Sequence, residues 1–376
     1  MRPNLFKYAT SELSQDAFIC WLLDAADSKY QNACPELCAL GQAFLSLIFS
    51  RHTDAPAPER IETVEIHRQK ARIDILCWVN RDIVIVIEDK VGTEQSPGQL
   101  RRYKAHAETG LKQPVSRRLH AYIQTGDQSD YSPVLLDGYS VLRRSDLLEL
   151  FESELGTRAR ATSHILDDFA SRLRHIENLV QSYKTTPIRN WGGRARIGFV
   201  SRLKEELGGG QWAYVHNGAG GFYGFFGKRV PVAGCKVYLQ VEMSPKENKL
   251  CFKIDVMEQN QQKHLRDLWH SKLIGESGRQ DVSIVRPGRL LTGKTMTVAK
   301  RGKPFPITDE LGCIDIARTV ELLRECQAII ETCARVDSTP GPQVDLMTSK
   351  MGADACLSQG QVPSTRAADE HEGISG

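Results

Sequence analysis

Residues 73–90 have the sequence IDILCWVNRDIVIVIEDK, in which two apolar runs flank a short polar segment. The second run, Ile83 to Ile87, is continuously apolar and β-branched, which is typical of a strand covered on both faces. Asn80 and Arg81 lie between the runs, and asparagine favours the tight turns that join hairpin strands. The pattern therefore predicts strands over residues 72–79 and 82–88, paired as a hairpin.

The segments around this hairpin predict a mixed α/β core. Helices are predicted over residues 11–27, 36–50, 98–109, 145–155 and 162–184, and further strands over residues 61–69 and 119–124. In the first helix, Leu13, Ala17, Cys20 and Trp21 form an apolar stripe at helical spacing. The predicted order of the core, αβββαβ, packs helices against a mixed sheet.

The remaining sequence predicts a smaller α+β domain and a tail. Pro187, Gly192 and Gly193 mark a boundary between a domain at residues 1–184 and one at residues 185–335. The second domain is predicted to hold helices near 195–207, 258–272 and 313–335, and strands near 212–216, 222–226, 236–243, 250–256, 281–285 and 294–299. Residues 336–376 contain six acids, two bases and no aromatic residue, which predicts a disordered acidic tail.

The composition is that of a globular protein, with 41% apolar and 25% charged residues in a chain of 376. The longest apolar run is far shorter than the ~20 residues of a spanning helix, and no signal peptide is recognised, so we expect a cytoplasmic protein without membrane contact. The ten cysteines are scattered and lack zinc-site spacing. Without the tail, 47 basic residues face 40 acidic ones, a balance that permits a polyanionic partner.

Acidic residues lie at the ends of the two hairpin strands that are away from the turn. Asp74 begins the first strand, and Glu88 follows the apolar run of the second, so the turn brings both carboxylates to one sheet edge. Two carboxylates at a strand end can bind a hard divalent cation and leave positions open for water and a substrate phosphate. Lys90 lies two residues beyond Glu88 and therefore points to the same side of the strand. Its charge can stabilise an attacking water or the charge that develops on phosphorus.

The triplet alone is weak evidence. Acid-x-lysine also occurs at residues 27–29 and 247–249, at a helix end and in a turn. The triplet at residues 88–90 differs, because it ends an apolar strand and has an acid one hairpin away. A simple salt bridge between Glu88 and Lys90 is the alternative interpretation.

The chain resembles the PD-(D/E)XK nuclease superfamily, and within it an uncharacterised bacterial and phage group. The shared order is a Glu-containing Trp-Leu-Leu helix with Glu12, a hairpin with Asp74, the triplet at residues 88–90, and a helix with Gln99. The residue before the first acid is isoleucine instead of the usual proline. The resemblance covers roughly residues 8–125 and implies a restriction-endonuclease-like fold.

The resemblance also implies roles for individual residues. Asp74 and Glu88 would bind Mg²⁺, which Mn²⁺ can replace, and the backbone carbonyl of Asp89 would add a ligand. Lys90 would orient and activate water, and Glu12 would complete the metal shell. Asp16 shares a helix face with Glu12, so the residues alone leave either acid facing the metal, or both complementing the helix dipole.

Basic segments predict where nucleic acid binds. Residues 96–118 hold six bases and one acid, and Gln99, Arg102 and Tyr103 of that helix are predicted to hold backbone phosphate. Residues 184–204 and 286–303 each hold six bases and no acid. In these two runs the predicted phosphate contacts are Arg194, Arg196, Lys300, Arg301 and Lys303. Solvated basic surface, or a surface for a protein partner, is the alternative.

Two motifs in the second half have competing interpretations. Residues 212–226 hold six of the 27 aromatic residues, which predicts either a packed hairpin core or a platform for stacked bases. Residues 288–295, GRLLTGKT, match the phosphate-loop pattern, but the alternating residues after Lys294 predict a strand instead of the required helix. We therefore interpret the match as coincidental, and a nucleotide-hydrolysing function that uses this loop is a third alternative.

Together these features predict a Mg²⁺-dependent nuclease that hydrolyses phosphodiester bonds, with DNA favoured over RNA. Roles in restriction, phage defence or repair follow from the resemblance. The alternative is a catalytically silent nucleic-acid-binding or scaffold module with the same fold. The sequence leaves open whether the chain also forms a homo-oligomer.

Overall fold

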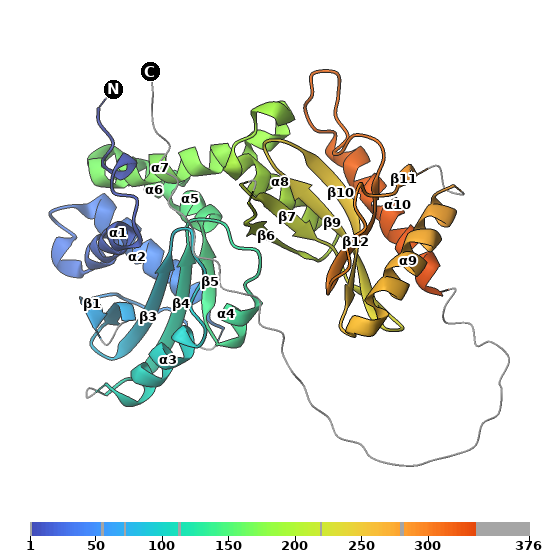
Figure 1. The fold of residues 1–376 in the computed structure, drawn as a ribbon. Helices are drawn as coiled ribbons and strands as arrows, with labels where there is room; N and C mark the ends of the chain where they lie inside the picture. The colour runs from blue at the N-terminus through green and yellow to red at the C-terminus, as the bar shows by residue number, and fades with distance from the viewer. Residues whose placement is uncertain are drawn as a thin grey trace, which may run out of the picture. The chain divides into compact units, whose positions relative to one another are not determined.

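A computed structural model describes residues 2–53, 56–70, 73–111, 114–218, 220–278 and 282–335 (Figure 1). These residues form two compact units, which divide between Asn178 and Leu179. The domain boundary near residue 185 stays a prediction, and the predicted disordered tail lies outside the described residues.

The first unit contains a mixed sheet with helices packed against it. Its helices are α1 (Glu12–Asp24), α2 (Pro35–Ser50), α3 (Gln99–Thr109), α4 (Ser132–Leu136), α5 (Arg144–Glu152), α6 (Glu154–Thr162) and α7 (His164–Gln181), and its strands are β1 (Val64–Lys70), β2 (Ile73–Val79), β3 (Ile83–Lys90), β4 (Arg117–Gln124) and β5 (Ser140–Arg143). The five described strands follow the order β1-β2-β3-β4-β5. The first three are antiparallel, and β4 and β5 continue parallel to β3. This confirms the predicted αβββαβ core and adds β5, which is too short to give a clear period.

The hairpin turn forms where the sequence predicts it. Asn80 and Arg81 both have positive φ angles, of 51° and 67°. Positive φ at consecutive turn residues gives the backbone twist that hairpin strands need. Ile83 therefore pairs with Val79, and the register brings Ile87 opposite Ile75.

Strand β3 is buried along its whole length, as its continuous apolar sequence predicts. On one face of the sheet, Ile85 and Ile87 belong to the core that contains α1 and α2. On the other face, Val84 and Val86 belong to the core that contains residues of α3. The alternation of strand side chains therefore divides β3 between two cores.

The predicted apolar stripe of α1 is partly wrong. Leu13 is 54% exposed, whereas the polar residues Gln15 and Asp16 are buried. The reason is that α1 packs against a strand end that carries polar groups, so Gln15 has a hydrogen-bond partner there, Asp89.

The second unit is α+β. Its helices are α8 (Gly193–Glu206), α9 (Gln262–Ser277) and α10 (Ile316–Arg335), and its strands are β6 (Gln211–Val215), β7 (Phe222–Phe226), β8 (Val230–Val232), β9 (Cys235–Met243), β10 (Asn248–Val256), β11 (Ile284–Val285) and β12 (Thr295–Arg301). The seven described strands form a sheet in the order β11-β12-β10-β9-β7-β6, with β8 pairing β9 off this path. Every described pairing is antiparallel.

Two contacts fix the loop that follows β4 in the first unit. A Cβ atom at Gly126 would lie 1.8 Å from the carbonyl oxygen of Val91, so glycine is required where this loop meets the end of β3. Arg144 then holds the loop: its Nη1 donates to the carbonyl oxygen of Thr125 at 2.7 Å, and its guanidinium forms ion pairs of 2.8 Å with Asp127 and Glu177. The end of β4 is thereby tied to α7.

We expect Arg144→Met to lower the free energy of unfolding of the first unit by about 3–5 kcal/mol, because two carboxylates lose their buried partner. Arg101→Gln is the matched control, because the Arg101 side chain is 78% exposed although it also pairs with an acid, Asp137. Urea denaturation followed by circular dichroism should shift for Arg144→Met and stay unchanged for the control. Equal midpoints for the two variants would contradict the proposed tether.

Candidate active site

The end of β3 carries the acid-acid-lysine triplet in an environment without solvent. Glu88 and Asp89 are both 0% exposed, and Lys90 is also buried. Since strand side chains alternate, Glu88 and Lys90 point to the α3 face of the sheet and Asp89 points to the α1 face. Extending the β2–β3 register by one residue places Asp74 opposite Glu88.

The predicted metal ligands meet at the side-chain ammonium of Lys90. Its Nζ lies 2.6 Å from Glu88 Oε1, 3.4 Å from Glu12 Oε2 and 3.9 Å from Asp74 Oδ2. It also donates a hydrogen bond of 3.0 Å to the carbonyl oxygen of Asp89. Four oxygen atoms, from α1, β2 and β3, thus surround one cationic group. We call Lys90 together with Glu12, Asp74, Glu88 and the Asp89 carbonyl oxygen the Lys90 cluster.

This cluster has more negative than positive charge. Three carboxylates surround one ammonium, and Glu88 Oε2 is buried without a hydrogen-bond partner. Burial raises the pKa of Glu88 to about 8; Lys90 opposes the shift and Asp74 adds to it. Burial alone would lower the pKa of Lys90, but the carboxylates of Glu88, Glu12 and Asp74 outweigh it and raise that pKa. Lys90 is therefore cationic at neutral pH, and the surplus acid favours a further cation.

Helix α3 contributes a second layer of polar contacts. Gln99 Nε2 donates to Glu88 Oε1 at 2.6 Å and to Tyr103 Oη at 3.0 Å, and Tyr103 is buried. Arg102 is exposed and contacts the carbonyl oxygen of Pro97 at 3.4 Å. The predicted phosphate-binding residues of α3 therefore lie in two environments. Gln99 contacts Glu88 of the Lys90 cluster and also bonds Tyr103, whereas Arg102 faces solvent.

The two acids of α1 lie in different surroundings. Glu12 contacts Lys90, and Thr93 Oγ1 donates to Glu12 Oε1 at 2.6 Å. Asp16 is buried and interacts with Asp89, and burial, followed by the charge of Asp74, raises its pKa to about 6. Glu12 therefore belongs to the Lys90 cluster, whereas Asp16 faces the opposite side of β3.

The side chain of Asp89 is enclosed on that opposite side. Gln15 Nε2 donates to Asp89 Oδ1 at 2.5 Å, and Thr125 Oγ1 donates to Gln15 Oε1 at 2.5 Å. Burial raises the pKa of Asp89 well above its ordinary value. Asp89 can therefore serve the Lys90 cluster through its carbonyl oxygen and not through its carboxyl group.

Gln124 is a residue of this region that the sequence analysis missed. It is the last residue of β4, pairs with Lys90 in the parallel register, and is 1% exposed. Neither its Oε1 nor its Nε2 has a hydrogen-bond partner. A polar residue at the end of the largely apolar strand 119–123 is the same signal that singled out Glu88, so it could have been found.

The predicted basic contacts of the second unit are dispersed. Arg196 is buried in α8, whereas Arg194 is partly exposed. Lys300 and Arg301 are consecutive residues of β12 and so point to opposite faces of the sheet, and Lys303 is exposed beyond the strand. The strand that follows Lys294 confirms that the glycine-rich loop is not a phosphate loop.

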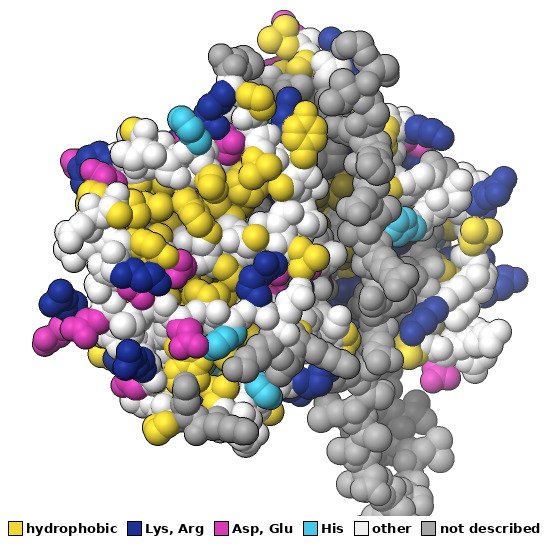
Figure 2. Space-filling view, turned by 90° about the vertical axis from the view of Figure 1, so that its left-hand side faces the viewer, with side chains coloured by type: hydrophobic (Ala, Val, Ile, Leu, Met, Phe, Trp, Pro, Cys, Tyr) yellow, Lys and Arg dark blue, Asp and Glu magenta, His cyan; other side chains and the backbone are white. Residues whose placement is uncertain are grey.

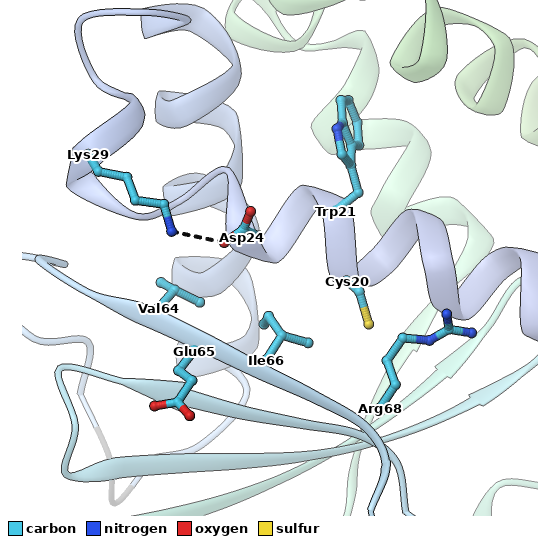
Figure 3. Close-up of a pocket in the computed structure, with 8 residues that line it drawn as sticks. All are labelled: Cys20, Trp21, Asp24, Lys29, Val64, Glu65, Ile66 and Arg68. Carbon is cyan, nitrogen blue, oxygen red and sulfur yellow. Dashed lines mark hydrogen bonds and ion pairs between the residues drawn. The ribbon is translucent and has the colours of Figure 1, made fainter.

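On the face drawn in Figure 2, apolar side chains gather in one area, and acidic and basic side chains are interspersed around it. A pocket of about 510 Å³ lies between α1 and β1 and is lined by Cys20, Trp21, Asp24, Lys29, Val64, Glu65, Ile66 and Arg68 (Figure 3). It shares no residue with the Lys90 cluster. Burial raises the pKa of Cys20 to about 12, so its thiol is a poor nucleophile.

No helix among the described residues combines the length and the apolar character needed to cross a bilayer. Nor do those residues bring three His, Cys, Asp or Glu side chains close enough together to ligate one ion by themselves. A metal at the Lys90 cluster would therefore need ligands beyond the side chains, of which the Asp89 carbonyl oxygen is one.

The raised pKa of Glu88 predicts how stability depends on pH in the presence of EDTA. Between the unfolded pKa near 4.5 and the folded value of about 8, the folded chain binds more protons at Glu88 than the unfolded chain does. Its contribution to the free energy of unfolding should therefore fall as pH rises, by up to about 1.4 kcal/mol per pH unit. Glu88→Gln cannot ionise and should flatten this part of the profile.

Urea denaturation at intervals from pH 5 to pH 8 measures the effect. Glu149→Gln, on an exposed position of α5, is the control and should keep the wild-type slope. If Glu88→Gln kept that slope as well, Glu88 would be ionised across the whole range.

The comparison with protein families agrees with this geometry. Residues 3–182 match the model of the PD-(D/E)XK nuclease superfamily, a range that contains the whole Lys90 cluster. No curated protein and no solved structure matches the chain significantly. By this match and by the αβββαβ core with its acid-acid-lysine strand end, residues 3–182 of the chain are similar to the PD-(D/E)XK nuclease superfamily.

Proposed function

We propose that the first unit is a Mg²⁺-dependent nuclease whose active site is the Lys90 cluster. The observation that carries the proposal is the convergence of the Glu12, Asp74 and Glu88 carboxylates and the Asp89 carbonyl oxygen on one ammonium group. Oxygen donors of this kind are the ligands that Mg²⁺ and Mn²⁺ prefer.

The donor set fits a divalent cation. Glu88 Oε2 is buried and without a partner, and a net negative charge remains after Lys90 is counted. Asp74 and Glu88, helped by Glu12 and the Asp89 carbonyl oxygen, would hold the ion. When bound, it supplies Lewis-acid stabilisation of the phosphate and lowers the pKa of a water.

The side chains of the cluster would divide the remaining work. Lys90 would hold the attacking water in line with the scissile bond and offset the charge that develops on the phosphorus oxygens. Gln99, which donates to Glu88 Oε1, would orient that carboxylate. The Gln124 amide, buried beside Lys90 without partners, can accept a hydrogen bond from water and donate one to a phosphate oxygen.

For the substrate we favour DNA over RNA, and we place the activity in the cytoplasm. Exposed Arg102 lies on α3 close to the cluster and can contact backbone phosphate. In the second unit, Arg194, Lys300, Arg301 and Lys303 would bind or position the strand, consistent with the two acid-free basic runs. The family's roles in restriction, phage defence and repair are all compatible with this chemistry.

We expect Asp74→Asn, Glu88→Gln and Lys90→Ala each to reduce Mg²⁺-dependent cleavage at least a hundredfold. A neutral amide binds a hard cation poorly, and loss of Lys90 removes the charge beside the attacking water. The measurement is a gel assay on plasmid, single-stranded DNA and RNA with Mg²⁺, Mn²⁺ or EDTA.

Asp137→Asn, which removes an acid paired with exposed Arg101, is the matched control and should keep wild-type activity. Cleavage by the wild type in excess EDTA would exclude the metal mechanism. A wild type that binds these substrates but cleaves none would support the silent binding module instead.

The two acids of α1 should behave differently. Glu12→Gln should raise the Mg²⁺ concentration for half-maximal rate several-fold, because Glu12 lies in the Lys90 cluster. Asp16→Asn should leave that concentration near the wild-type value, since Asp16 faces Asp89. Rates measured over a Mg²⁺ titration decide between them, and the reverse pattern would move the metal site to the α1 face of β3.

A further inference from the structure

Arg196 is a buried cation without an acidic partner. It lies in the first turns of α8 and is 7% exposed. Among the described residues its guanidinium has no hydrogen bond or ion pair, and Tyr223 is the titratable group that acts on it. Buried charges in proteins are normally paired, because burial removes part of their hydration. The surroundings of Arg196 therefore favour an anion.

The helix around Arg196 provides further groups that attract an anion. Helix α8 begins at Gly193, and its N-cap, Gly192, contributes no side-chain hydrogen bond. The backbone N–H of Arg196 already bonds the carbonyl oxygen of Gly192, so the N–H groups of Gly193 and Ala195 lie beyond the intrahelical pattern. These groups and the helix dipole favour a negative charge at this end.

The absence of a side chain at Gly193 lets the Tyr223 hydroxyl approach this end of the helix. A Cβ atom there would lie 2.9 Å from Tyr223 Oη. Residues 193 and 196 share a helix face, and helical side chains lean toward the N-terminus. The guanidinium of Arg196 is thus directed toward the first turn of α8, where Tyr223 lies.

The surroundings suit a nucleotide phosphate. The run 184–204 contains six bases and no acid, so no carboxylate of the helix start competes with an anion. The Tyr214 ring lies 5.0 Å from that of Tyr223 and 4.7 Å from that of His216. Partly exposed aromatic rings beside a phosphate site can stack on a base.

We propose that the N-terminus of α8, with Arg196 and Tyr223, binds a terminal phosphate carried by a nucleotide or by the end of a nucleic-acid strand. A terminal phosphate carries more charge and more free oxygens than an internal diester, which matches a guanidinium and a helix N-terminus at one point. This site lies in the second unit, and its occupancy does not depend on cleavage at the Lys90 cluster.

Titration of the full chain with inorganic phosphate in EDTA tests the site, by calorimetry and by thermal unfolding at constant ionic strength. The wild type should bind phosphate saturably and unfold at a higher temperature when it is bound. Arg196→Met should bind at least tenfold more weakly, yet unfold no earlier than the wild type without phosphate, because it removes an unpaired buried charge. Arg202→Gln on the same helix is the control, because Arg202 is already paired with Glu205 and Glu206.

Absence of saturable binding by the wild type, or unchanged binding by Arg196→Met, would overturn the proposal. If Arg196→Met does not fold, Gly193→Ala decides, since its methyl group would meet the Tyr223 hydroxyl and push it away from the helix start while Arg196 remains. Wild-type phosphate affinity in Gly193→Ala would then overturn it.

Two further ligands distinguish the sources of the phosphate. A 5′-phosphorylated single-stranded oligonucleotide that binds at least tenfold tighter than its 5′-hydroxyl counterpart, with the difference lost in Arg196→Met, indicates a strand end. Tight binding of a nucleoside monophosphate without that difference indicates a free nucleotide. Because EDTA is present throughout, a failure of nuclease activity would leave these results unaffected.

Discussion

The contact between Lys90 Nζ and Glu88 Oε1, 2.6 Å long at the buried end of β3, is the interaction on which the first unit depends. A lysine and a glutamate at a position without solvent are costly unless each finds compensating groups. Here the lysine finds them in Glu12, Asp74 and the Asp89 carbonyl oxygen, which come from three different elements. The fold is therefore arranged so that α1, β2 and β3 meet at one charged point.

Alternation along β3 separates the polar groups of that point into two sets. Glu88 and Lys90 face α3, where Gln99 and Tyr103 continue the network. Asp89 faces α1, where Gln15 donates to its carboxyl group and in turn accepts a hydrogen bond from Thr125. One strand end thus presents charged side chains suited to a cation on one face, and on the other face a carboxyl group whose hydrogen bond holds α1. The hydrogen bond from Arg144 to Thr125 holds the neighbouring end of β4 in place.

The two units contain opposite electrostatic situations. At Lys90 a buried cation has more carboxylates than it needs, which favours an additional cation. At Arg196 a buried cation has no carboxylate, which favours an anion. In both places the uncompensated charge favours a ligand of the opposite sign.

The sequence by itself determined the strands, the hairpin turn and the triplet of this protein, because they are set by local patterns. The continuous run Ile83 to Ile87 specified a covered strand, and Asn80 with Arg81 specified the turn. The αβββαβ order and the neighbourhood of Asp74, Glu88 and Lys90 followed from these.

Which groups stand next to one another across the sheet was decided by the tertiary structure alone. Gln124 lies beside Lys90 because of the parallel β3–β4 register. Leu13 is exposed while Asp16, on the same helix, is buried. Arg196 of α8 is buried instead of lying on a basic surface. A sequence period states that a side chain lies on a face, but the packing of other elements decides whether that face meets solvent, a core or a charge.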